Sequence, residues 1–111
     1  MNDAEHFEYL ESIFSERLIS AEVLDFAKEA WIELKDAGFP LPSACSGPDR
    51  TLLYAWDNGC HHLELEFFAD NNMEFFYLNR ENDSNWIADY LPEFPLPQEV
   101  LDKLQYFKEN N

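Results

Sequence analysis

The chain has few of the residues on which several protein classes depend. It contains seven lysines and arginines against 23 aspartates and glutamates, and its net charge is −16. Direct binding to nucleic acid or to an anionic membrane is therefore not expected, because both are polyanions. The chain has only three glycines and no phosphate-binding loop of the G-x-x-x-x-G-K type. No apolar run approaches the length of a transmembrane helix.

Cysteine is also scarce. The chain has two cysteines, Cys45 and Cys60. The N-terminus is acidic and lacks the apolar segment of a secretory signal. We therefore expect a cytoplasmic protein with reduced thiols. The length of 111 residues and the hydrophobic content of 46% predict a single folded domain, residues 1–111, rather than a disordered chain.

Residues 51–80 predict three antiparallel strands that are joined by two turns. Asn58-Gly59 is a strong hairpin signal, because both residues tolerate the positive φ of a type I′ turn. Asp70-Asn71-Asn72 marks the second turn. A two-residue loop at Asn58-Gly59 would place Tyr54 opposite Leu63. A two-residue loop at Asn71-Asn72 would likewise place Leu65 opposite Leu78.

The alternation of side chains along a strand then divides these residues between two faces. The core face is predicted to carry Leu52, Tyr54, Trp56, His61, Leu63, Leu65, Phe67, Phe76 and Leu78. The second face mixes carboxylates with aromatic side chains, and its members include Glu64, Glu66, Phe68, Phe75 and Tyr77. Protein interfaces favour aromatic residues and complementary charge, so the second face is a candidate docking surface for a basic protein. The alternative is that another helix covers it.

Helices are predicted on both sides of this meander. The first spans residues 4–16, the second runs from an N-cap at Ser20 to Gly38, and the third spans 98–108. Residues 39–50 are predicted to form a loop, because prolines interrupt them. Residues 86–90 fit a short fourth strand or one helical turn, and we favour the strand. The predicted fold class is α+β, with N-terminal helices, a three- to four-stranded antiparallel meander and a C-terminal helix.

The second helix offers a further acidic surface. Its carboxylates include Glu22, Asp25, Glu29 and Glu33. Side chains at such spacings can resemble the phosphates of a nucleic-acid duplex, as in phage and plasmid anti-restriction and anti-CRISPR proteins. A solvated helix face is the commoner explanation of the same pattern.

The sequence carries no catalytic or metal-binding signature, and no cofactor is predicted. Cys60-His61-His62 lacks the paired spacing of a structural zinc site, and neighbouring residues of a strand point to opposite faces. Cys45, in the proline-bounded segment, has no family-type nucleophile motif around it. A small enzyme or metal-binding protein that uses Cys45 or the Cys60/His62 pair remains the alternative reading.

A further pattern in the chain comprises Pro40-Leu41-Pro42, Asp49, Leu52, Tyr54, Trp56-Asp57, Leu63-Glu64-Leu65-Glu66, Glu74 and Phe76-Tyr77. This pattern resembles that of a group of small bacterial and phage α+β proteins of no established activity. Where that pattern has a glycine after the aspartate of the loop, this chain has Arg50. The resemblance implies the strand meander and a bacterial or phage origin, and it implies no catalytic residue.

These observations favour a non-enzymatic acidic module that binds a basic protein such as a nuclease, an effector or a toxin. We expect an inhibitor, an antitoxin-like protein or an anti-defence protein that competes for a basic nucleic-acid site. A homodimer stays open. Acidity that serves only solubility is the alternative explanation of the charge.

Overall fold

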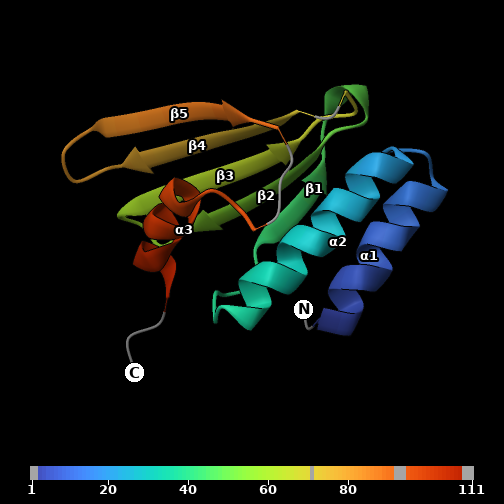
Figure 1. The fold of residues 1–111 in the computed structure, drawn as a ribbon, viewed down its shortest axis with the longest axis horizontal. Helices are drawn as coiled ribbons and strands as arrows, with labels where there is room; N and C mark the ends of the chain where they lie inside the picture. The colour runs from blue at the N-terminus through green and yellow to red at the C-terminus, as the bar shows by residue number, and fades with distance from the viewer. Residues whose placement is uncertain (1–2, 71, 92–94, 109–111) are drawn as a thin grey trace.

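The chain begins with two helices that lie side by side, α1 at Asp3–Ser15 and α2 at Ala21–Asp36 (Figure 1). Ser20 caps α2 as predicted, because its side chain accepts a hydrogen bond from the backbone N–H of Val23 at 3.2 Å. The predicted apolar stripe of α2 is confirmed, and its buried members are Leu24, Ala27, Trp31 and Leu34. The structure is a computed structural model, and it describes residues 3–70, 72–91 and 95–108.

Five antiparallel strands follow in the spatial order β1-β2-β3-β4-β5. They are β1 Ser43–Ser46, β2 Leu52–Asp57, β3 His61–Phe67, β4 Met73–Asn79 and β5 Ser84–Tyr90. The predicted α+β class is confirmed, with more strands than expected. The favoured strand at 86–90 is present as part of β5. The segment 39–50 is not a loop throughout, because β1 forms between Pro42 and Pro48 at the edge of the sheet, where flanking prolines break no ladder.

Arg50 ends the turn between β1 and β2 in the left-handed region, with a φ of 65°. The residue before it, Asp49, has a φ of 56°. Glycine adopts this conformation without the steric cost that a Cβ brings, which explains why a glycine would suit position 50. The arginine side chain has a compensating contact, because its Nη2 donates to the carbonyl oxygen of Ile19 at 3.3 Å.

The first hairpin differs from the predicted register by two residues. Tyr54 pairs with Leu65 rather than with Leu63, because the connection is longer than the Asn58-Gly59 loop alone. The Asn58 side chain accepts hydrogen bonds from two backbone N–H groups beyond it, those of Cys60 at 3.1 Å and His61 at 2.8 Å. A shift of two residues leaves every side chain on its predicted face.

The second hairpin corrects the prediction for β4. Residues 68–72 separate the two strands, and Asn71 lies outside the described residues. Leu65 therefore pairs with Phe75, and Leu63 pairs with Tyr77. The predicted positions differ from these by an odd number of residues, so the faces of β4 are exchanged. Phe76 and Leu78 point away from the core, and it is Met73, Phe75 and Tyr77 that are buried.

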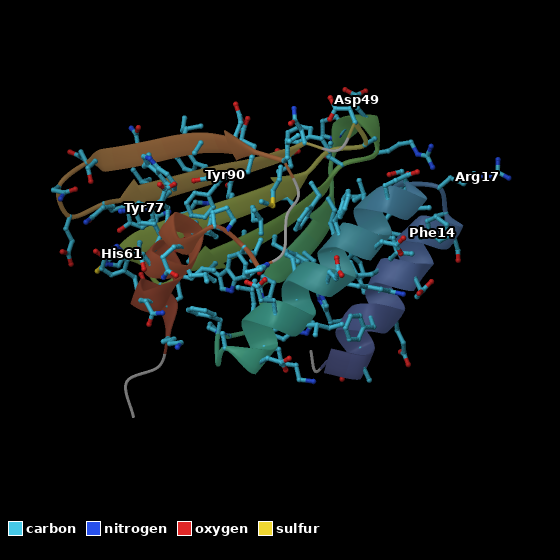
Figure 2. The ribbon with its side chains drawn as sticks, viewed as in Figure 1. Phe14, Arg17, Asp49, His61, Tyr77 and Tyr90 are labelled. Atoms are coloured by element: carbon cyan, nitrogen blue, oxygen red, sulfur yellow. The ribbon has the colours of Figure 1, made fainter. Side chains whose placement is uncertain are left out.

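All three helices pack on one face of the sheet. The Tyr54 hydroxyl of β2 donates to the carbonyl oxygen of Ala27 in α2 at 2.8 Å. The third helix, α3 at Gln98–Leu104, continues into a 3-10 turn at Gln105–Phe107 and lies beside His61 and Tyr77 (Figure 2). Its Lys103 sits over the Tyr77 ring. The helices therefore cover β2, β3 and β4 from the same side.

Candidate partner-binding surface

The face of the sheet opposite the helices carries half-buried and exposed side chains only. Every fully buried side chain of the five strands points toward the helices. We call the opposite side the outer face. It comprises Ser43, Cys45, Leu53, Ala55, Asp57, His62, Glu64, Glu66, Glu74, Phe76, Leu78, Asn85, Ile87 and Asp89. No helix in the described part of the chain covers this face.

Three carboxylates form a row across the outer face. Glu66 on β3 pairs directly with Glu74 on β4, and Glu74 pairs with Asp89 on β5. Neighbouring strands lie about 4.8 Å apart, so like charges face each other across two strand pairs, an arrangement that destabilises a sheet. We call these residues the acidic row. Partial burial and the charges of Asp89 and Glu66 raise the pKa of Glu74.

The five described strands contain no lysine or arginine that would neutralise the acidic row. The cation at the margin of the outer face is Arg80, in the turn after β4, and it already binds Asp57 through both carboxylate oxygens, at 3.0 and 2.8 Å. These hydrogen bonds, with those from the Gly59 N–H and His62, hold the pKa of the Asp57 carboxyl well below its usual range. The second ring nitrogen of His62 lies 2.8 Å from a carboxylate oxygen of Glu64.

Apolar side chains lie beside the acidic row. Phe76 pairs with Ile87 in the next row of the sheet, and Glu64 is the neighbour of Phe76 on the other side. Ile87 is 60% exposed. A guanidinium group binds a carboxylate through two parallel hydrogen bonds and also stacks on an aromatic ring. Carboxylates next to a half-buried aromatic ring therefore suit arginine side chains of a partner.

Some residues of the predicted docking surface lie together on the outer face, and others do not. Glu64 and Glu66 lie on the outer face, as expected. Phe75 and Tyr77 do not, because they are 0% and 4% exposed in the core, where Lys103 of α3 sits over the Tyr77 ring. Phe68 is half-buried just beyond the end of β3. The prediction for the two aromatic residues is wrong because the second connection shifts the register by an odd number of residues, which exchanges the faces of β4.

Several outer-face residues were missed by the sequence reasoning. Glu74, Phe76, Ile87 and Asp89 belong to the surface, and none was selected from the sequence. The alternation of side chains along MEFFYLN could have identified the outer-face residues of β4. Apolar residues occur on both faces of this strand, however, so the alternation did not show which face is buried. The β5 members depend on a pairing that the sequence does not specify.

The carboxylates of α2 form a separate surface on the helix side of the sheet. Glu22, Asp25 and Glu29 are exposed. Glu33 is half-buried, and both its carboxylate oxygens accept from the backbone N–H of Leu96, at 2.8 and 3.0 Å. Glu33 thus holds the segment before α3 against α2. The acidic face of α2 and the outer face are on opposite sides of the molecule, so one flat partner surface does not contact both.

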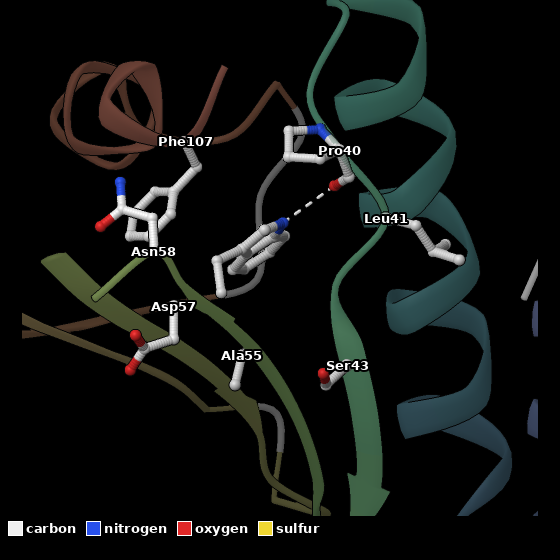
Figure 3. Close-up of a pocket in the computed structure, with 8 residues that line it drawn as sticks. Pro40, Leu41, Ser43, Ala55, Asp57, Asn58 and Phe107 are labelled. Carbon is white, nitrogen blue, oxygen red and sulfur yellow. Dashed lines mark hydrogen bonds between the residues drawn. The ribbon is translucent and has the colours of Figure 1, made fainter. Parts of the chain in front are cut away.

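A hollow of about 360 Å³ lies beside Trp56 at the end of β2 (Figure 3). The indole N–H donates to the Pro40 carbonyl oxygen at 2.9 Å, and Phe107 closes one side. Asp57 is the carboxylate among the described residues that line the hollow, and it is bound to Arg80. No described cysteine or histidine lines it. The Ser43 hydroxyl is the possible nucleophile in the lining, and no described histidine stands beside it as a base.

The two cysteines lie in different parts of the sheet. Cys45 is exposed on β1 opposite Leu53, whereas Cys60 is exposed in the turn after β2. A hydrogen bond to Glu81 and the charge of that carboxylate raise the pKa of the Cys60 thiol, the opposite of what activates a nucleophile. No group of three or more histidine, cysteine, aspartate or glutamate side chains among the described residues is arranged to hold a metal ion.

Comparison of the chain with protein-family models, with curated proteins and with solved structures found no match. The resemblance to small bacterial and phage proteins therefore stays a prediction. None of the helices that the structure describes combines the length and the apolar character needed to cross a membrane.

Proposed function

We propose that this protein is an acidic binding module that docks onto a basic protein through the outer face. The observation that carries the proposal is the acidic row of Glu66, Glu74 and Asp89 on a sheet face that no described helix covers. The strands supply no cation to this row, and the net charge of the chain is −16. A partner that supplies cations would complement both the local and the overall charge.

The physical argument concerns the free energy of the unbound state. Three opposed carboxylates repel one another, and partial burial together with the charges of Asp89 and Glu66 raises the pKa of Glu74. A guanidinium group that enters the row removes this repulsion and gains charge-assisted hydrogen bonds. Phe76 and Ile87 provide apolar area next to these hydrogen bonds. The surface therefore gains more from an arginine-rich partner than a set of well-separated surface carboxylates would.

The finer proposal is that the partner handles nucleic acid and that the module inhibits it. A basic nucleic-acid site on a nuclease, an effector or a toxin offers the arginine-rich surface that the outer face suits. An antitoxin-like or anti-defence protein would then compete with nucleic acid for that site. The exposed carboxylates of α2, Glu22, Asp25 and Glu29, support the acidic character of the whole molecule but lie on the other side of it.

The docking proposal is tested with two peptides of equal length and charge, one rich in arginine and one rich in lysine. Binding is measured by fluorescence anisotropy at low and at physiological salt. The wild type should bind the arginine peptide more tightly, and the affinity should fall as salt rises. The double variant Glu66→Gln/Glu74→Gln should lose about tenfold in affinity or more, because charge-assisted hydrogen bonds are worth about 1.5–3 kcal/mol.

The matched control is the double variant Asp25→Asn/Glu29→Gln, which removes the same charge from the exposed face of α2. Its affinity should change by less than about twofold. Equal losses in both variants would show that only net charge matters, and the outer face would not be the binding site. The same proteins then serve as baits in a bacterial lysate. A basic protein retained by the wild type and the control, but lost from the outer-face variant, is the expected partner.

A competition experiment with nucleic acid tests whether the module inhibits its partner, separately from whether it docks. Nucleic acid that the captured partner binds should be displaced as the module is added. A ternary complex of partner, nucleic acid and module would contradict the inhibitory role while leaving the docking intact.

A further inference from the structure

The two edges of the sheet differ in how they are protected against pairing with another chain. At one edge, β1 has four residues and lies between Pro42 and Pro48. At the other edge, β5 has seven residues, and it contains no proline, lysine or arginine. Its pairing with β4 runs without a bulge from Ser84 to Tyr90. Short strands, prolines, charged side chains and bulges are the usual protections of an edge, and of these β5 has only the charge of Asp89.

The side chains of β5 complement a second copy of the same strand. In an antiparallel pair centred on Ile87, Asn85 lies opposite Asp89 and Trp86 lies opposite Ala88. The first pair joins an amide to a carboxylate, and the second joins a large side chain to a small one. The centre of the pair places Ile87, which is 60% exposed, against its own copy. No like charges oppose each other in this register.

We propose that two copies of the chain associate through β5, antiparallel and with Ile87 on the two-fold axis. The β5 edges then share a ladder of backbone hydrogen bonds, and the two sheets become one continuous sheet. The outer faces of both copies lie on the same side of it. A single pair of short strands buries less area than a standard interface, so dimerisation depends on concentration.

Charge disfavours the register that is centred on Asp89. With Ile87 at the centre, the Asp89 carboxylates of the two copies are about 13 Å apart along the strands, beyond the Debye length of about 8 Å at physiological salt. A slide that centres the pair on Asp89 would bring them directly opposite each other. Each copy has a net charge of −16, so added salt strengthens the dimer. Docking of a basic partner should weaken as salt is added, which is the opposite dependence. The dimer and the docking can therefore be tested separately, and one can fail while the other holds.

The association is tested by sedimentation over the whole range of concentration in which the protein is soluble. The wild type should pass from monomer to dimer, with a tighter dimer at higher salt. Ile87→Lys places two ammonium groups together on the axis and should weaken the dimer about tenfold or more. The matched control is Ile32→Lys on α2, at a site that is 49% exposed, and it should dimerise as the wild type does.

Cross-linking tests the register. The exposed Cys45 and Cys60 are first replaced with serine. In that background Ile87→Cys should form a disulfide dimer under mild oxidation, because directly opposed residues of antiparallel strands lie within disulfide range. Asp89→Cys should not. A wild type that stays monomeric, a dimer that Ile87→Lys leaves intact, or equal cross-linking of Ile87→Cys and Asp89→Cys would each overturn the proposal.

Discussion

Replacement of Glu74 with glutamine should stabilise the protein while it weakens partner binding. Glu74 is flanked directly by Glu66 and Asp89, and two opposed pairs of like charge disappear in the variant. A cross-strand pair is worth about 0.2–1 kcal/mol, so the expected gain in the free energy of unfolding is roughly 0.4–2 kcal/mol. For a chain of this length the gain corresponds to a rise of about 2–8 °C in the melting temperature.

The pH dependence of this gain follows from the raised pKa of Glu74. A carboxyl with a raised pKa in the folded state favours folding in its protonated form. Stability from that form is fully present below the unfolded pKa, about 4.3, and is lost as pH rises through the higher folded pKa. The wild type therefore carries the whole repulsion at neutral pH and little of it below about pH 4. Glu74→Gln should be more stable than the wild type at neutral pH, and the difference should vanish in acid.

The measurement is thermal unfolding followed by circular dichroism at neutral pH and in acid, at low and high salt. Glu16→Gln is the control, because it removes one negative charge at an exposed turn after α1. Its melting temperature should change little. High salt should reduce the gain of Glu74→Gln by screening. A variant no more stable than the wild type at neutral pH, or a gain that persists in acid, would refute the assignment of repulsion to the acidic row.

Three further substitutions test the core and its polar contacts by chemical denaturation. Trp56→Ala removes a side chain that is 4% exposed and should cost about 3–5 kcal/mol; an unchanged midpoint would contradict its place in the core. Tyr54→Phe leaves the Ala27 carbonyl without its side-chain donor in a buried site and should cost about 1–3 kcal/mol, with near-native circular dichroism. Glu33→Ala removes both acceptors of the Leu96 N–H and should cost about 1.5–3 kcal/mol, whereas a loss near zero would show that these hydrogen bonds do not hold α3 in place.

The elements with strong local signals were predictable from the sequence. Ser20 and Gly38 bound α2, and its helical stripe faces the core. The faces of β2 and β3 were also predictable, because the large apolar residues of each strand alternate and so lie mainly on one face. The register error of two residues does not move any side chain to the other face. Local hydrogen bonding and period-2 alternation are properties of the chain itself, which is why a single sequence specifies them.

The face of β4 and the composition of the outer face were decided only by the tertiary structure. The strand MEFFYLN has apolar side chains at both parities, so alternation alone could not select Phe75 over Phe76 for the core. The selection depends on the length of the 68–72 connection, on Trp86 of β5 against Phe75 with ring centres 5.0 Å apart, and on α3 over Tyr77. These contacts join residues distant in sequence, and burial of one face left the acidic row on the other. The sequence by itself determined the acidity and the strands, whereas long-range packing determined which carboxylates share a surface.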